Sequence, residues 1–231
     1  MSWPDSPAEL IAAQIELASA APEPWSPPDA PFRIGACFAC FSRGRSGRGE
    51  AGELAWAGAA LTLGSRPLGT VVVRGVAGAP YESGLLALRE GALLEAATRA
   101  LEDRPAVLLV NATGRDHPRR AGLALHLGSV LDLPTVGVTH RPLLASGAWP
   151  ESRRGATAPL LLDGEIVGVW LCTRPGRRPI CVHTAWRTDV DVAAAVVISA
   201  LRRARTPEAI RRARRAARLA RAGLLPASQP P

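Results

Sequence analysis

The stretch from Ala106 to Gly128 most constrains the fold, because an apolar run, a polar loop and a helical segment follow one another without a break. Residues 106–110 (AVLLV) have the length and composition of a buried strand, and residues 111–116 (NATGRD) form a polar loop. His117-Pro118-Arg119 is typical of a helix start, since proline is favoured at the first helical position. Ligands collect at the carboxyl ends of strands in an open α/β sheet, so we expect the functional site at this loop.

The rest of the chain predicts a mixed α/β fold, because an opening group of strands is followed by alternating helices and strands. The expected strands are 33–41, 54–63, 68–74, 106–110, 133–138, 158–162, 165–172 and 179–183, and the expected helices are 7–20, 85–103, 119–131, 189–202 and one from about 206. The first three strands form an antiparallel meander, the later βαβ units pair in parallel, and Asp163-Gly164 closes a hairpin. This order matches the ribonuclease H-like arrangement of a mixed sheet flanked by helices.

Positive charge is concentrated at the C-terminal end of the chain. From Arg202 onward there are nine arginines and one glutamate, a net charge of +8, which equals the net charge of the whole chain. A basic helix of this kind favours nucleic acid by neutralising phosphates. The alternative interpretation is a solvated helix face.

These patterns divide the chain into three parts. Residues 1–31 are an N-terminal helix and a proline-rich linker, 32–203 a globular domain, and 204–231 a basic helix and tail. The glycine- and arginine-rich segment 42–52 is expected to be a hairpin loop. Because no run of 18 apolar residues and no signal pattern occurs, we expect a cytoplasmic protein without membrane contact, and a monomer.

Several short motifs, in this order and spacing, resemble the endonuclease V family, which nicks nucleic acid beside inosine. They are Pro80-Tyr81, the segment 84–91 (GLLALREG), residues 117–120 (HPRR), Gly122-Leu123-Ala124, His126-Leu127-Gly128, residues 133–138 (LPTVGV) and residues 173–176 (TRPG). The resemblance runs from the N-terminal helix to about Ala200. It implies a ribonuclease H-like fold in which carboxylates at strand ends hold Mg²⁺ for phosphodiester hydrolysis.

The resemblance also implies that four functional positions have changed. The aspartate of the first strand falls on Phe38, and the second aspartate, in the loop after strand 106–110, falls on Asn111. The family's late histidine falls on Trp186, and its lysine after the Gly-Val pair falls on His140. A phenyl ring offers Mg²⁺ no ligand, and an amide offers an oxygen without charge.

Two functional positions are retained in the same resemblance. Glu90 matches the family's metal-binding glutamate, and His117 matches its loop histidine. Asp116 lies close by in sequence and is an alternative partner for Glu90 in a shifted Mg²⁺ site. The structural alternatives are an ion pair of Glu90 with Arg89, Arg119 or Arg120, and a role for His117 in fixing the loop.

A base-binding pocket is the remaining implication. Tyr81 resembles the aromatic wedge that the family inserts beside the lesion, and backbone around Gly84, the 111–114 loop, Gly122 and Gly137 would enclose the flipped base. The residues expected to contact nucleic acid are Pro80, Tyr81, Gly84, Leu85, Gly114, Arg119, Arg120 and Gly122. The structural alternative for Tyr81 is a turn residue that covers the helix start.

Three functions are therefore compared. The leading hypothesis is an endonuclease V-like protein that binds DNA or RNA, retains a pocket for inosine or a damaged base, and has lost cleavage. The second is an active Mg²⁺-dependent endonuclease that uses Glu90, Asn111, Asp116 and His117. The third is a protein-interaction scaffold without catalysis.

Overall fold

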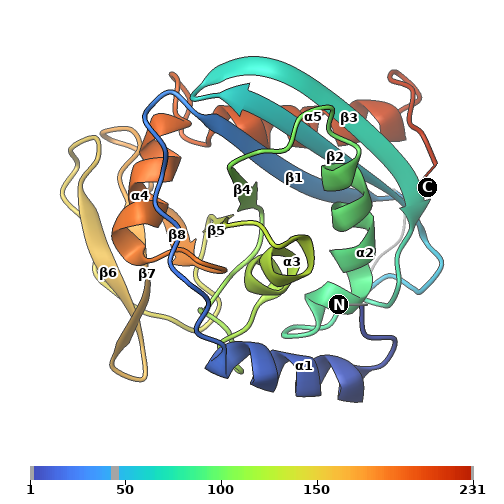
Figure 1. The fold of residues 1–231 in the computed structure, drawn as a ribbon, viewed down its shortest axis with the longest axis horizontal. Coiled ribbons are helices and arrows are strands. Elements are labelled where there is room, and N and C mark those ends of the chain that lie inside the picture. Colours follow the sequence, from blue (N-terminus) through green and yellow to red (C-terminus); the bar gives the residue numbers. More distant parts are fainter. Residues whose placement is uncertain (1–2, 43–46, 230–231) are drawn as a thin grey trace.

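In a computed structural model that describes residues 3–42 and 47–229, eight strands form one sheet in the order β3-β2-β1-β4-β5-β8-β7-β6 (Figure 1). The strands are β1 Arg33–Phe41, β2 Leu54–Leu63, β3 Arg66–Val76, β4 Val107–Val110, β5 Thr135–Thr139, β6 Thr157–Leu162, β7 Glu165–Leu171 and β8 Ile180–Thr184. The helices are α1 Pro7–Ser19, α2 Leu86–Arg99, α3 Leu123–Leu131, α4 Val190–Ser199 and α5 Glu208–Arg221. Of the expected loop 42–52, residues 43–46 lie outside the described part.

The pairing of the strands confirms the predicted mixed sheet. Strands β1, β2 and β3 are an antiparallel meander, and β1, β4 and β5 are parallel neighbours. Strand β8 returns antiparallel to β5 and carries the β6-β7 hairpin. Because β1, β4 and β5 run in the same direction, their carboxyl ends meet at one edge of the sheet, where side chains from different segments converge.

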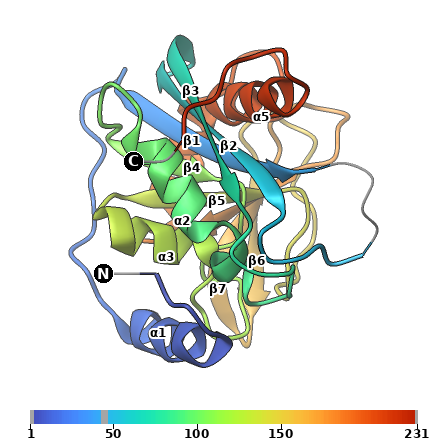
Figure 2. The ribbon, with the colours of Figure 1, turned by 90° about the vertical axis from the view of Figure 1, so that its right-hand side faces the viewer.

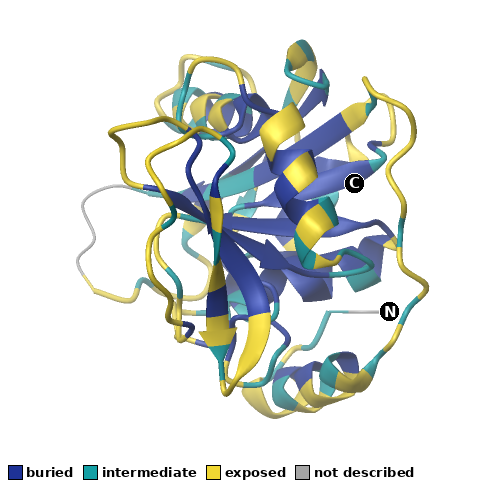
Figure 3. Cartoon of the chain, turned by 90° about the vertical axis from the view of Figure 1, so that its left-hand side faces the viewer, coloured by how far each residue is buried: buried dark blue, intermediate teal, exposed yellow. Residues whose placement is uncertain are grey.

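Apolar side chains on both faces of the sheet hold the layers together. In β4, Leu108 and Val110 point into the core beneath α2 and α3, whereas Val107 and Leu109 point into the core beneath α4 and α5. Figure 2 shows α5 on one side of β1, β2 and β3 and the α2-α3 pair on the other. The strands are mostly buried between helices whose outer faces are exposed (Figure 3).

Helix α5 packs on the sheet at backbone distance. A Cβ atom added at Gly58 of β2 would lie 2.3 Å from the carbonyl oxygen of Ala213. Ala213 and Ala217 are completely buried against this strand. The basic C-terminal helix is therefore part of the core, and its buried face consists largely of alanines.

Both outer strands of the sheet carry one additional bridge. Ser228 pairs with Val73 of β3, and its amide donates to the carbonyl of Val72 at 3.0 Å. At the other edge, Ser146 and Leu161 exchange both backbone hydrogen bonds beside Pro159 of β6. Segments outside the regular strands thus cover part of each edge.

The predicted helix start at His117-Pro118-Arg119 is wrong. Helix α3 begins at Leu123, and the loop after β4 extends to Gly122. Arg120 has a left-handed φ of 55°, and the Gly122 amide donates to the carbonyl of Gly114 at 2.8 Å. This tertiary hydrogen bond turns the chain where the local pattern alone favoured a helix.

The β6-β7 turn is as predicted, since Asp163 and Gly164 both have positive φ, 50° and 82°. None of the described helices is long and apolar enough to cross a membrane.

A buried histidine predicts how stability depends on pH. His126 is completely buried, it stacks on Trp3 with ring centroids 4.7 Å apart, and its ring nitrogens have no hydrogen-bond partner in the described part of the chain. Burial lowers the pKa of His126 to about 4, well below its unfolded value. As the pH falls, His126 therefore takes up a proton in the unfolded chain before it does so in the folded one. This difference lowers the free energy of unfolding as the pH falls from about 6.5 toward 4.

Between pH 7 and pH 5 the free energy of unfolding falls in the wild type. We expect this fall to be roughly 1–2 kcal/mol smaller in His126→Phe. Urea unfolding at both pH values measures this difference. His183, whose pKa burial also lowers to about 4, still titrates in the variant, so part of the acid loss remains. Equal losses in the two proteins would contradict the prediction.

Candidate functional site

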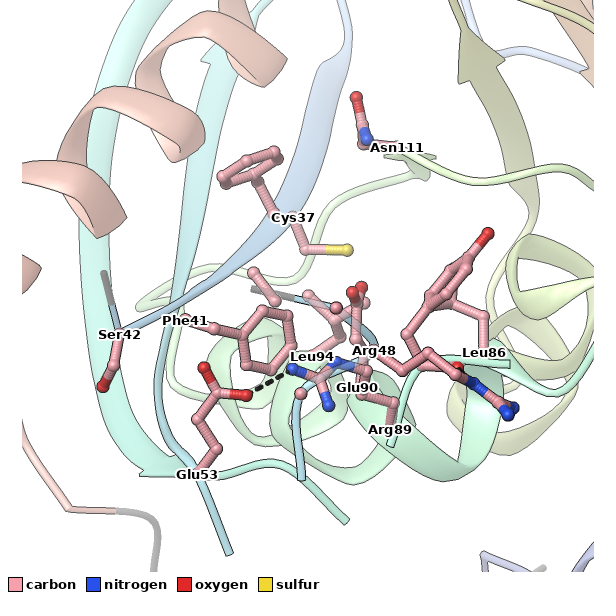
Figure 4. Close-up of a pocket in the computed structure, with 15 residues that line it drawn as sticks. Cys37, Phe41, Ser42, Arg48, Glu53, Leu86, Arg89, Glu90, Leu94 and Asn111 are labelled. Atoms are coloured by element: carbon pink, nitrogen blue, oxygen red, sulfur yellow. Dashed lines mark hydrogen bonds and ion pairs between the residues drawn. The ribbon is translucent and has the colours of Figure 1, made fainter. Parts of the chain in front are cut away.

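A cavity of about 450 Å³ opens at the carboxyl end of β1 and is bounded by α2, the loop after β4 and residues 47–53 (Figure 4). Phe38 and Cys37 come from β1, Glu90 from α2, and Asn111 follows β4 directly. Three sequence-predicted residues, Phe38, Glu90 and Asn111, thus line one space. The parallel β1-β4 pairing explains this convergence.

Glu90 is half-buried in this cavity. Burial raises the pKa of Glu90 to about 7, and the positive charge of Arg89 opposes the rise. Arg89 itself forms a buried ion pair with Glu53 at 2.7 Å and lies over the Phe41 ring at 3.9 Å. Figure 4 shows this pair beside Glu90, whose carboxylate reaches into the cavity.

The other two arginines considered as partners of Glu90 form their hydrogen bonds elsewhere. Arg119 donates to Gln14 at 2.6 Å and to the carbonyl of Gly84 at 2.9 Å. Arg120 contacts Asp163 at 3.1 Å on the β6-β7 turn. Among the described residues, therefore, Glu90 forms no ion pair with Arg89, Arg119 or Arg120.

An arginine of α5 that was not predicted from the sequence contacts two residues that line the cavity, Asn111 and Phe38. Arg214 donates from Nη2 to Oδ1 of Asn111 at 2.9 Å. Its guanidinium carbon lies 5.1 Å from the Phe38 ring centroid, and that of Arg218 lies 5.7 Å from the same ring. The signal in the sequence is the spacing of four residues, which places both arginines on one helix face.

Asp116 does not join Glu90. Its side chain is completely buried, and its two oxygens accept hydrogen bonds from the amides of Leu143, Leu144 and Ala145 at 2.7 to 2.9 Å. Asp116 thus fixes the loop after β5. The arrangement gives no support to a shifted metal site shared by these two carboxylates.

The residues at the cavity do not fit Mg²⁺. This ion requires near-octahedral oxygen ligands with negative charge, and among the described lining residues Phe38 and neutral Asn111 stand beside Glu90, while the carboxylate of Glu53 is paired with Arg89. A guanidinium, a fixed positive charge, is already bonded to the amide oxygen. Across residues 3–42 and 47–229, no three His, Cys, Asp or Glu side chains cluster as a metal would need.

His117 fixes the turn that precedes α2. Its Nε2 lies 3.1 Å from the Gly84 carbonyl, which also accepts hydrogen bonds from Gln14 and Arg119. Burial is the main cause that lowers the pKa of His117 to about 4, so the ring is neutral at pH 7. Gly84 has a φ of 81°, a conformation that side chains disfavour. The loop-fixing alternative for His117 accounts for these contacts.

A second, smaller cavity of about 190 Å³ adjoins the first. Its lining includes Gly84, His117 and residues 111–113, and it shares Tyr81, Leu86 and Asn111 with the first cavity. Tyr81 is 48% exposed at the junction. Arg48 pairs with Glu82, the residue after Tyr81, at 2.7 Å and donates to the Tyr81 carbonyl, so the negative charge beside Tyr81 has a positive partner.

Other predicted contact residues support this wall from behind. A Cβ atom at Gly122 would lie 2.4 Å from the Thr113 carbonyl oxygen, and one at Gly114 would lie 2.0 Å from that of Thr184. These glycines allow backbones to pack closely beneath the loop. Pro80, which precedes Tyr81, is exposed, whereas Leu85 is buried in the core.

The other two positions at which the resemblance implies a change lie apart from Glu90. His140 follows β5, and its Nδ1 is 2.6 Å from Nη2 of Arg205. Trp186 packs against the core on the α3 side, and its amide donates to the Thr135 hydroxyl at 3.1 Å. His140 thus joins a cluster of positive charge, while Trp186 is structural.

Known proteins resemble the chain in sequence. The sequence profile of the family described as Endonuclease V matches residues 49–215. The Endonuclease V of Nocardia farcinica is 41% identical over 156 residues, which are 67% of this chain and 68% of that protein. The Endonuclease V of Methanopyrus kandleri is 43% identical over 141 residues, 61% of this chain and 60% of that protein.

Solved structures resemble the fold over nearly its whole length. The Endonuclease V of Streptomyces avermitilis superposes with a TM-score of 0.83 at 33% identity, covering 95% of this chain and 94% of that one. The Endonuclease V of Ciona intestinalis, bound to a 24mer DNA that contains an inosine, superposes with a TM-score of 0.73 at 21% identity, covering 94% and 98%. The latter likeness is one of fold.

The close packing behind the loop predicts a large effect of one methyl group. We expect Gly122→Ala to lower the melting temperature by about 5–10 °C, because the new Cβ meets backbone oxygens that cannot move independently. Gly69→Ala in β3 is the matched control, since its Cβ would have nothing within 4 Å. Similar melting temperatures for the two variants would contradict this account.

Proposed function

The chain belongs to the endonuclease V family, and from this relation we propose that it binds nucleic acid at the two adjoining cavities without cleaving it. The smaller cavity receives an inosine or damaged base, and the larger one faces the sugar-phosphate backbone. The observation that carries the proposal is their junction at Tyr81, Leu86 and Asn111, where base and phosphate subsites would have to meet.

Base capture is supported by walls that need no metal. The small cavity is lined by residues 111–113 and by the Gly84 turn, which three side chains hold in place. Backbone groups and shape can recognise the edge of a flipped base. The DNA-bound relative from Ciona intestinalis supports the same ligand class by analogy of fold.

Loss of cleavage is supported by the charges around Glu90. Phosphodiester hydrolysis with Mg²⁺ depends on carboxylates that hold the ion and orient water. Here Glu53 is committed to Arg89, and Phe38 and Asn111 supply no negative charge. The active-nuclease hypothesis is favoured by family membership and the scaffold hypothesis by the loss of ligands, so both are tested directly.

We expect no metal-dependent nicking of inosine-containing DNA or RNA. Purified protein is incubated with each labelled strand and Mg²⁺ or Mn²⁺, with the Streptomyces avermitilis relative as the reference nuclease and Glu90→Gln as the contamination control. Product should not exceed that formed by the variant. Metal-dependent scission that disappears on neutralising Glu90 would establish the active-nuclease hypothesis instead.

Tyr81 should contribute to binding through stacking. We expect Tyr81→Ala to weaken binding of an inosine-containing strand by about 5- to 150-fold, the range of roughly 1–3 kcal/mol for a stacked base. Tyr81→Phe retains the ring and should bind as the wild type does. An identical strand with adenine tests base preference, and an unchanged affinity of Tyr81→Ala would contradict the wedge role. A scaffold would bind neither strand.

A further inference from the structure

The guanidinium of Arg214 lies between the two side chains that stand at the changed carboxylate positions. It contacts the amide oxygen of Asn111 and the face of Phe38. Arg218, one turn further along α5, approaches the same ring. Two positive charges on one rigid helix thus face the carboxyl ends of β1 and β4.

These charges lack counter-ions within the part of the chain that the structure describes. The acids that line the cavity are Glu53, which is paired with Arg89, and Glu90 on the α2 side. The Arg214 Nε is buried without a hydrogen-bond partner among the described residues, and Arg218 is exposed. A partly buried cation without a paired anion is unfavourable, so the α5 side of Phe38 and Asn111 favours an anionic ligand.

Further positive charge extends the same edge. Arg205 contacts His140 at the end of β5. The pKa of His140 is lowered first by burial and then by the charges of Arg205, Arg214 and Arg178. Phe38 of β1, Asn111 after β4 and His140 after β5 thus each contact an arginine.

We propose that Arg214 and Arg218 form a metal-independent phosphate site and that its ligand is the phosphodiester backbone of a nucleic acid strand. The inference rests on the proposed function and deepens it, because it assigns the phosphate contact to arginines instead of a cation. Guanidinium groups suit this ligand, since each presents several N–H donors that match phosphate oxygens. Glu90 repels a phosphate from the α2 side, so the backbone lies nearest α5.

A purely structural role for the two arginines makes a different prediction. If they only hold α5 against Phe38 and Asn111, their removal changes stability but not the salt dependence of binding. A phosphate site instead contributes to that salt dependence, because each contact releases condensed counterions. The slope of affinity against salt therefore separates the two roles.

The test is fluorescence anisotropy of a labelled single strand containing inosine, in EDTA, at about 50–200 mM salt. We expect the double variant Arg214→Gln, Arg218→Gln to bind at least about tenfold more weakly at low salt and to reduce the salt slope by about 1.4. The matched control is Arg211→Gln, Arg215→Gln, which removes the same charge at the same spacing from another face of α5, beside Thr70. It should change affinity less than threefold.

Melting temperatures show whether the variants fold. If the Gln pair unfolds, Phe38→Asp replaces it, because a carboxylate beside both guanidiniums would neutralise them and should likewise weaken binding in EDTA.

The outcomes separate the two proposals. Three results would overturn the phosphate site and leave nucleic acid binding in place. The double variant Arg214→Gln, Arg218→Gln binds as the wild type does, the control variant loses as much affinity, or binding by the wild type requires Mg²⁺. Failure of the wild type to bind any strand would overturn both.

Discussion

The close approach of α5 to β2 at Gly58 is the contact on which the character of the site depends. No other residue type would let the Ala213 carbonyl lie so near the strand. On the helix held there, Arg214 contacts Phe38 and Asn111, and Arg218 lies over the Phe38 ring. Packing between backbones at one position thus places positive charge at another, beside β1 and the end of β4.

Much of the fold could be predicted because alternating and helical patterns are local. The meander, the parallel strands and the Asp163-Gly164 hairpin all follow from them. The start of α3 could not, because Arg120 and Gly122 are turned by a hydrogen bond to Gly114 that only the folded chain creates. Local propensity favoured a helix there, and tertiary structure prevailed.

The candidate site was predictable in part for the same reason. Strand ends placed Phe38, Glu90 and Asn111 near one another, and the structure brings them to one cavity. Arg214 was missed because it lies 103 residues from Asn111 in sequence. The spacing of four residues puts Arg214 and Arg218 on one helix face, but it does not say which face of the helix turns inward. Asp116 was considered as a partner of Glu90 because it is adjacent to His117 in sequence. The sequence did not show that its side chain is buried and bonded to the amides of residues 143–145.

The bridges at Ser228 and Ser146 bear on how copies of this protein meet. An outermost strand exposes unpaired amide and carbonyl groups that can recruit a strand from another molecule. Here the chain's own tail lies along β3, and a loop residue lies along β6, where Pro159 also removes one donor. These segments occupy part of the hydrogen-bonding edge of each outer strand. We therefore expect them to disfavour pairing of the sheet with a strand of another molecule, and so edge-to-edge aggregation.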